Sequence, residues 1–182
     1  YVAASDTGTG THTATLYLGD RAPSHGSGVQ AYLTPSVALG AGTPNIQITY
    51  TDQDGNTGQT TPTVLPISNA TAPIGNIEYS GVAAGKYGPF IPLAAGDGGI
   101  RLAEQFNYNV THTSGTTNLV LCRPLLTLPM TTIGVAAERD LLNQLPSLPR
   151  VYDGACLTWL MYAGAATPVT SAFYGHLDLA WG

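Results

Sequence analysis

The chain has 182 residues, of which 43% are apolar and only 9% are charged, and its formal net charge is −5. This length fits one domain with one core, and a single lysine, five arginines and no basic run make nucleic acid or an anionic membrane a poor partner. No apolar run reaches the roughly 18 residues of a transmembrane helix, and no signal peptide is apparent at the start.

Short runs typical of β-strands alternate with glycine and proline along the first half of the chain. In the run 11–19 (THTATLYLG), threonine and tyrosine alternate with other residues, and this period of two predicts a strand. The run 28–39 contains Pro35, which favours an edge strand or a bend. Residues 45–51 (NIQITYT) alternate again and predict a half-buried strand, and the run 57–67 returns after a turn.

The remaining extended runs are interrupted by turns of similar composition. They lie at 76–82, 88–96, 99–112, 116–129, 154–164 and 171–182. The glycine-rich sequence AGDGG inside this part lacks the Lys-Ser/Thr pair and the following helix of a phosphate-binding loop, so we predict a turn there.

One segment has helical rather than strand spacing. Val135, Leu141, Leu142 and Leu145 recur near helical intervals with strong helix formers between them, and Pro146 follows. We therefore predict one short α-helix near 135–145. Together with eight to ten strands, this indicates an all-β fold: an antiparallel β-sandwich of jelly-roll or immunoglobulin-like type. The domain is predicted to span 13–182, after a flexible N-terminal arm at 1–12 that is rich in glycine and threonine.

The turn sequence DQDGN offers the one candidate metal site. Asp52, Asp54 and Asn56 place side-chain oxygens at alternate positions, and oxygen is the ligand that calcium prefers. An EF-hand loop needs a glutamate at its twelfth position, where this chain has Thr63, and both flanks alternate like strands. Gly55 provides the positive φ angle that a tight hairpin requires. We predict a hairpin turn, with a cation bound at Asp52, Asp54 and Asn56 as the alternative.

Other motifs do not support catalysis, and we assign no catalytic and no cofactor-binding residue. The sequence SDTG at 5–8 matches the Asp-Thr-Gly triplet of aspartic proteases, but that chemistry needs two carboxylates and the triplet lies near the chain end. The histidines lack the spacing of a metal site. A triad of His25 or His176 with Ser27 and Asp178 would have to come from distant parts of the chain, and no motif supports it.

The two cysteines, Cys122 and Cys156, each lie in an apolar stretch. We interpret them as two buried free thiols in a reducing cytoplasm. A single disulfide between adjacent strands is the alternative, and a zinc site is disfavoured because no histidine is close to them in the sequence.

Phrases spread over most of the chain from about Gly28 onward carry a resemblance. They are YTDQDGN, PFIPLAAGDGGIR, the helix sequence AERD, LPSLPRVYDGA and the terminal FYGHLDLAWG. In these phrases the chain resembles virion structural proteins of tailed bacteriophages. The low charge agrees with a surface that is covered by other subunits, although a neutral extracellular β-domain would share it.

The resemblance implies a non-enzymatic structural protein of the phage particle. We expect a capsid decoration (cement) protein on the capsid surface of the virion, assembled in the host cytoplasm, without cofactors. Its expected partners are the major capsid protein and copies of itself in a homo-oligomer. Two alternatives remain open: a tail or baseplate structural protein, and a carbohydrate-binding module or hydrolase that uses tyrosine and tryptophan on a sandwich face.

Overall fold

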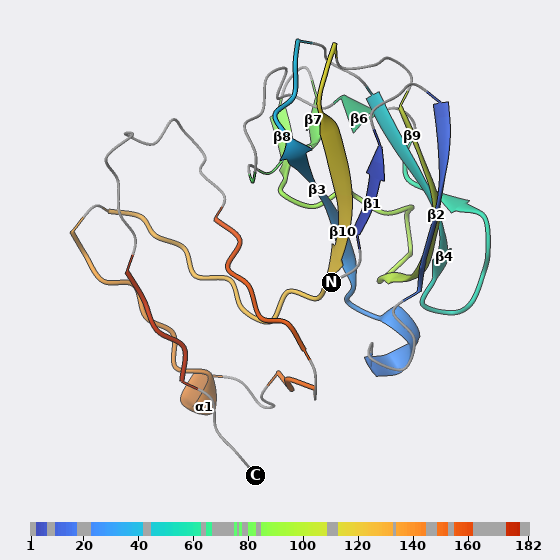
Figure 1. The fold of residues 1–182 in the computed structure, drawn as a ribbon. Coiled ribbons are helices and arrows are strands. Elements are labelled where there is room, and N and C mark those ends of the chain that lie inside the picture. Colours follow the sequence, from blue (N-terminus) through green and yellow to red (C-terminus); the bar gives the residue numbers. More distant parts are fainter. Residues whose placement is uncertain are drawn as a thin grey trace.

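The computed structural model describes most of the chain between residues 3 and 178 and is shown as a ribbon in Figure 1. The described residues are 3–6, 10–17, 23–41, 45–62, 65–66, 75, 77, 80–82, 85–108, 113–132, 134–144, 149–152, 155–161 and 174–178. Antiparallel β-strands account for nearly all of their regular structure, which confirms the predicted all-β fold. No helix in these ranges is long and apolar enough to cross a membrane.

The strands follow one another along the first two-thirds of the chain. They are β1 (Ala3–Asp6), β2 (Gly10–Tyr17), β3 (Gln30–Val37), β4 (Asn45–Asp52), β5 (Gln59–Thr60), β6 (Leu65–Pro66), β7 (Ser80–Val82), β8 (Gly85–Gly88), β9 (Ile100–Tyr108) and β10 (Thr116–Cys122). Two short helical segments are the 3-10 turn η2 (Pro23–Gly26) and the helix α1 (Leu141–Gln144). The predicted strands at 11–19, 28–39, 45–51 and 99–112 correspond to β2, β3, β4 and β9.

Two larger sheets make up the fold. One has the strand order β1-β10-β3, and the other has the order β2-β9-β4-β5, with β6 also paired to β4. A separate two-stranded sheet contains β7 and β8. The pairings are antiparallel, and most of them join strands that are far apart in the sequence, as β3 and β10 are.

Alternating side chains along β4 provide part of the core. Ile46, Ile48 and Tyr50 are at most 1% exposed, whereas Gln47 and Thr49 between them are half-buried. This is the period of two that predicted a half-buried strand, because successive side chains of a strand point to opposite faces. Burying an apolar side chain of this size stabilises the fold by about 1.5–3 kcal/mol.

The other sheet contributes to the same core. Leu33 from β3 and Leu119 and Leu121 from β10 are at most 1% exposed and belong to one cluster with the buried residues of β4 and β9. Within β9, the rings of Phe106 and Tyr108 meet edge to face with 5.8 Å between their centroids. The two larger sheets are therefore held together by a shared apolar core.

The strand β3 forms an edge of its sheet, as expected for a strand that contains Pro35. Its outer side is covered at two points. The carbonyl oxygen of Pro35 accepts a hydrogen bond from the Gly75 amide at 3.1 Å, and that of Ala31 accepts one from the Ile91 amide at 2.8 Å. Covering an edge strand in this way reduces its tendency to pair with other chains.

The N-terminal residues differ from the predicted flexible arm at 1–12. Residues 3–6 form β1 on the edge of β10, and β2 already begins at Gly10. Within the SDTG sequence, Asp6 pairs with Thr117 of β10, while Thr7 and Gly8 lie outside the described residues. Every residue except proline carries both a backbone donor and a backbone acceptor, so strand pairing does not depend on side-chain type. The glycine- and threonine-rich composition therefore did not prevent β1 and β2 from pairing.

The helix is shorter than predicted. Only residues 141–144 are helical, and the preceding residues 135–140 are irregular. Isolated helices of about ten residues are marginal unless an apolar face is packed. Here Val135 is 66% exposed and Ala137 is only half-buried, so this segment has no core against which a longer helix could pack.

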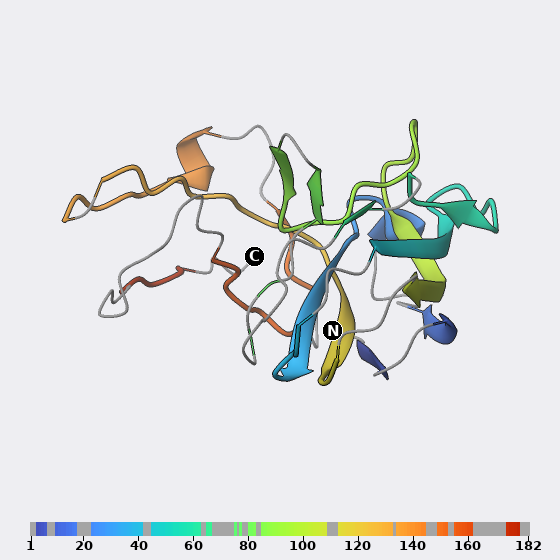
Figure 2. The same ribbon diagram turned by 90° about the horizontal axis from the view of Figure 1, so that it is seen from above.

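The strands predicted at 154–164 and 171–182 are wrong for the residues that can be described. Residues 155–161 and 174–178 are extended or irregular and belong to no sheet, since a ladder needs a neighbouring strand. Seen from above in Figure 2, the chain after β10 lies to one side of the larger sheets. We call the described residues from Arg123 to Asp178 the C-terminal segment.

Candidate functional site

The predicted hairpin turn between β4 and β5 is built around the side chain of Asp52. Its Oδ1 accepts hydrogen bonds from the amides of Asp54 at 2.8 Å and Asn56 at 2.9 Å, and its Oδ2 accepts one from Asn56 Nδ2 at 2.7 Å. Gly55 adopts a φ of 92° and donates its amide to the Asp52 carbonyl oxygen at 3.2 Å. The amide hydrogen bond from the Asn56 side chain, followed by those from the turn backbone, holds the pKa of Asp52 below its ordinary value.

This turn is fixed to the loop before β9, which the sequence analysis did not anticipate. The Tyr50 hydroxyl donates to Asp97 Oδ2 at 2.5 Å and accepts from the Ala94 amide at 2.8 Å. Gln53 Oε1 accepts from the amides of Gly98 at 2.9 Å and Gly99 at 3.1 Å. Burial, and then the bond to Asp97, raise the pKa of Tyr50. We call residues 52–58 and 94–99 together the loop pair.

A further acidic residue, Glu104 of β9, stands beside the loop pair. Glu104 Oε1 accepts a hydrogen bond from the hydroxyl of Thr51 at 2.7 Å and a longer one from the Gly58 amide at 3.4 Å. Glu104 therefore connects β9 to both ends of the hairpin turn. The predicted turn in the AGDGG sequence is also present, where the Asp97 amide donates to the Ala94 carbonyl oxygen at 3.1 Å.

The structure brings the three candidate cation ligands into one turn but uses most of their oxygens there. Both oxygens of Asp52 accept turn hydrogen bonds, and Asp54 Oδ2 accepts one from Gln53 Nε2 at 2.9 Å. Within the described ranges, no group of three or more histidine, cysteine or acidic side chains is arranged to hold a metal ion. The antiparallel pairing of β4 with β5 confirms the hairpin.

Comparison with protein-family models, curated proteins and solved structures finds no match.

The histidine, serine and aspartate residues considered for a triad lie in two different parts of the molecule. His176 Nε2 is 3.7 Å from Asp178 Oδ2, and both side chains are largely exposed. His25 lies within η2, and Ser27, which directly follows η2, bridges to Gly99. Figure 1 shows η2 and residues 174–178 on opposite sides of the molecule, so the structure does not bring these four residues together.

The C-terminal segment has a second feature that the sequence analysis missed. Large apolar side chains on it are exposed to solvent, five of them at residues that were expected to be in strands. They are Met130, Val135, Val151, Leu157, Trp159, Met161, Tyr174 and Leu177. Among the other residues whose burial the structure describes, Val37 is the one exposed large apolar side chain. A concentration of apolar surface of this kind marks a site of interaction with another molecule.

A few polar contacts hold the C-terminal segment to itself. Arg139 Nη1 donates to the Thr127 carbonyl oxygen at 2.9 Å, which connects two parts of the segment that are 12 residues apart. The guanidinium of Arg150 lies over the ring of Tyr152, with 5.1 Å between Cζ and the ring centroid, a cation–π contact. These contacts lie on the surface and do not form a core.

The two cysteines are free thiols in different environments. Cys122, the last residue of β10, is half-buried, and its burial raises the pKa of the thiol to about 11. Cys156 is exposed on the C-terminal segment. The expectation that both thiols are buried is therefore wrong for Cys156, because its apolar neighbours in the sequence are themselves exposed.

Proposed function

We propose that this chain is a non-enzymatic structural protein of a phage particle, which binds the capsid shell and stabilises it as a decoration (cement) protein. The observation that carries the proposal is the C-terminal segment. Of the side chains whose burial the structure describes, nine large apolar ones are exposed, and eight of these lie on it. Leaving apolar surface in water costs about 25 cal/mol per Å², so this segment is expected to be covered in the assembled state.

Two properties of the sequence support the same proposal. The phrases from about Gly28 onward resemble virion structural proteins, and only 9% of the residues are charged. A subunit that is packed among others needs less charge to stay in solution than a free monomer does. A protein that binds only the assembled shell stabilises it by mass action, and repeated weak contacts over a lattice add up.

We infer further that the two larger sheets form a β-sandwich of jelly-roll or immunoglobulin-like type. Their shared core supports this, because Leu33 and Leu119 of one sheet belong to the same cluster as Ile48 and Phe106 of the other. A sandwich presents its loops at its two ends.

The proposal is tested on particles of the phage that encodes this chain. Electron microscopy of particles with and without the protein should show added density at regular positions on the shell. Heating the same two kinds of particle should show that shells with the bound protein release their contents at a higher temperature. Density on the tail or baseplate would favour the alternative of a tail protein. Particles that lack the protein altogether would contradict the proposal.

The exposed aromatic rings favour one candidate of a different class. Trp159 is 69% exposed and Tyr174 is 95% exposed, and such rings also stack on sugars in carbohydrate-binding modules. Binding of the purified protein to a glycan array, lost in Trp159→Ala and retained in Val37→Ala, would support a carbohydrate-binding module. The absence of any bound glycan would remove this candidate.

A further inference from the structure

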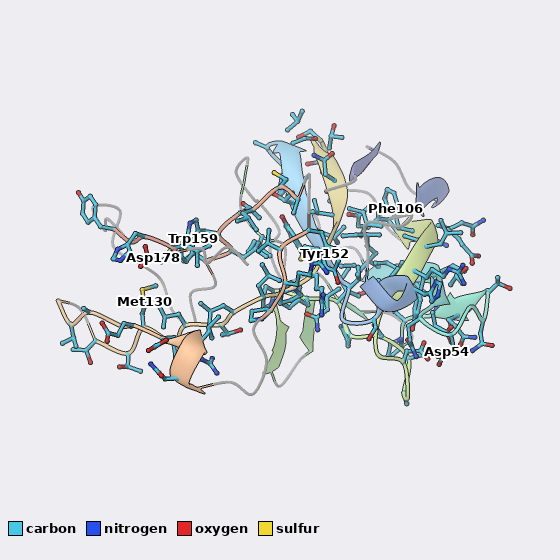
Figure 3. All side chains as sticks on the ribbon, turned by 90° about the horizontal axis from the view of Figure 1, so that it is seen from below. Asp54, Phe106, Met130, Tyr152, Trp159 and Asp178 are labelled. Atoms are coloured by element: carbon cyan, nitrogen blue, oxygen red, sulfur yellow. The ribbon has the colours of Figure 1, made fainter. Side chains whose placement is uncertain are left out.

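The buried core of the protein ends before the C-terminal segment begins. The core cluster reaches Leu121 of β10 and contains no later residue. From Cys122 onward, every residue whose burial the structure describes is half-buried or exposed. Figure 3 shows Met130 and Trp159 on the side of the molecule away from Phe106, which belongs to the core. The apolar core that stabilises the two larger sheets therefore includes no described residue of the segment.

A sharp boundary separates the segment from the rest of the chain, and we call the described residues up to Cys122 the β-domain. The strand β10 ends at Cys122, and Arg123 and Pro124 after it are both exposed. Because proline has no backbone N–H to donate, Pro124 does not continue the ladder of β10. A Cβ built on Gly28 would be 3.5 Å from Arg123 Nε, so the side chain of Arg123 still lies beside the β-domain. The change from paired to unpaired backbone thus falls at Arg123 and Pro124.

The polar contacts described above for the segment join its own residues. Arg139 donates to the Thr127 carbonyl oxygen, and the guanidinium of Arg150 lies over the ring of Tyr152. The Ala155 amide donates to the Tyr152 carbonyl oxygen at 3.0 Å. These contacts give the segment local structure, but they do not attach it to the sheets.

The two parts of the chain therefore differ in what keeps them folded. The β-domain has a buried core and strands that pair over long distances in the sequence, so it is expected to unfold as one cooperative unit. Regions with few buried apolar contacts and exposed backbone open locally while such a core stays folded. The described C-terminal segment has both of these properties.

We propose that the C-terminal segment is an arm that opens from the β-domain as a unit of its own, turning about Arg123 and Pro124, while the two larger sheets stay folded. The arm is a conformational device, because it moves its exposed apolar side chains without disturbing the core. The proposal goes beyond the proposed function, since it concerns the free protein and requires no particular partner.

The first test is limited proteolysis of the full-length protein by trypsin, which cuts after arginine and lysine, at neutral pH without denaturant. Arg139 and Arg150 are exposed on the arm, whereas Arg101 is half-buried in β9, between β2 and β4. Cutting after Arg101 requires β9 to leave its sheet. We therefore expect cleavage after Arg139 and Arg150 to be about a hundredfold faster or more. Equal rates at the three sites would overturn the proposal.

The second test asks whether the arm opens independently of the β-domain. Tyr50→Phe removes a hydroxyl that bonds Asp97 and the Ala94 amide inside the β-domain. It should raise the rate of cleavage after Arg101 about fivefold or more, because global opening becomes more frequent. The rate after Arg139 should stay within about twofold of the wild type, since that site opens locally. A parallel rise at both sites would mean that the arm opens only when the whole protein unfolds.

The third test is urea denaturation of a matched pair of variants and of protein that trypsin has cut after Arg139. Leu121 is 1% exposed and Leu157 is 43% exposed, so Leu121→Ala should lower the urea midpoint and Leu157→Ala should leave it unchanged. The cut wild type needs no substitution and decides the matter even if Leu121→Ala fails to fold. It should keep the midpoint of the intact protein, and a clear fall after cutting would show that the arm supports the β-domain. None of these measurements involves a shell, so they stand apart from the test of the proposed function.

Discussion

The hydroxyl of Tyr50 lies 2.5 Å from Asp97 Oδ2, although the two residues are 47 positions apart in the sequence. The same hydroxyl accepts the Ala94 amide, so one side chain at the end of β4 fixes the position of the loop before β9. Gln53 makes a parallel connection to the amides of Gly98 and Gly99. The hairpin turn and the AGDGG turn therefore form one rigid end of the domain.

Removing the Tyr50 hydroxyl should destabilise the protein. We expect Tyr50→Phe to lower the free energy of unfolding by about 1–3 kcal/mol, because a hydrogen bond to a carboxylate is lost and the Ala94 amide loses its acceptor. Urea denaturation measures this loss. The control is Tyr174→Phe, whose ring is 95% exposed and whose effect should stay within about 0.5 kcal/mol. Equal midpoints for both variants would contradict the role given to Tyr50.

Asp52 should make the stability depend on pH in the acid range. Its pKa is lowered in the folded state from the ordinary value of 3.8, so the folded protein binds this proton less readily than the unfolded chain. The stabilisation is therefore complete above about pH 4 and is lost as the pH falls through the lowered pKa. Urea midpoints measured from neutral to acid pH should fall in that window.

The variant Asp52→Asn isolates this contribution. It has no carboxylate to protonate, so its urea midpoint should fall less steeply below pH 4 than that of the wild type. Asp54→Asn is the matched control, since Asp54 lies at the exposed tip of the same turn and should leave the Asp52 contribution in place. If Asp52→Asn and the wild type lose stability in parallel, Asp52 does not carry the dependence.

Local patterns in the sequence were sufficient to predict β4 and the hairpin turn that follows it. The alternation of Ile46, Ile48 and Tyr50 and the glycine at position 55 are each contained within a few residues, and the structure has both features. The bond from Tyr50 to Asp97 depends on β4 and β9 being neighbours in a sheet. That adjacency follows from long-range topology, and no spacing within the sequence indicates it.

The same reasoning explains the failure in the C-terminal segment. The run 154–164 is rich in apolar and aromatic residues, and this composition predicted a strand. Composition shows that a segment is apolar, but a strand also needs a partner for its backbone. In the described structure residues 155–161 belong to no sheet, and Leu157, Trp159 and Met161 are exposed instead of buried.

Gly99 should be intolerant of any side chain. A Cβ built at this position would be 2.1 Å from the Gly26 carbonyl oxygen and 2.8 Å from the Gly28 amide nitrogen, both of which belong to backbone. We expect Gly99→Ala to lower the free energy of unfolding by about 2 kcal/mol or more, because η2 must move away from β9. Thermal unfolding measures it. Gly175→Ala is the control, with open space around the added Cβ; similar melting temperatures for the two variants would contradict the close approach.

The two thiols should differ in reactivity in the native protein. At neutral pH and low protein concentration, we expect a thiol-specific reagent to modify one thiol per chain rapidly. The reactive residue is the exposed Cys156, because Cys122 is half-buried and burial raises its pKa to about 11. Mass spectrometry of the modified peptide identifies the site. In Cys156→Ser the rapid reaction should disappear, and in urea the wild type should react at both thiols. Rapid modification of Cys122 in the folded protein would show that the end of β10 is more open than the structure has it.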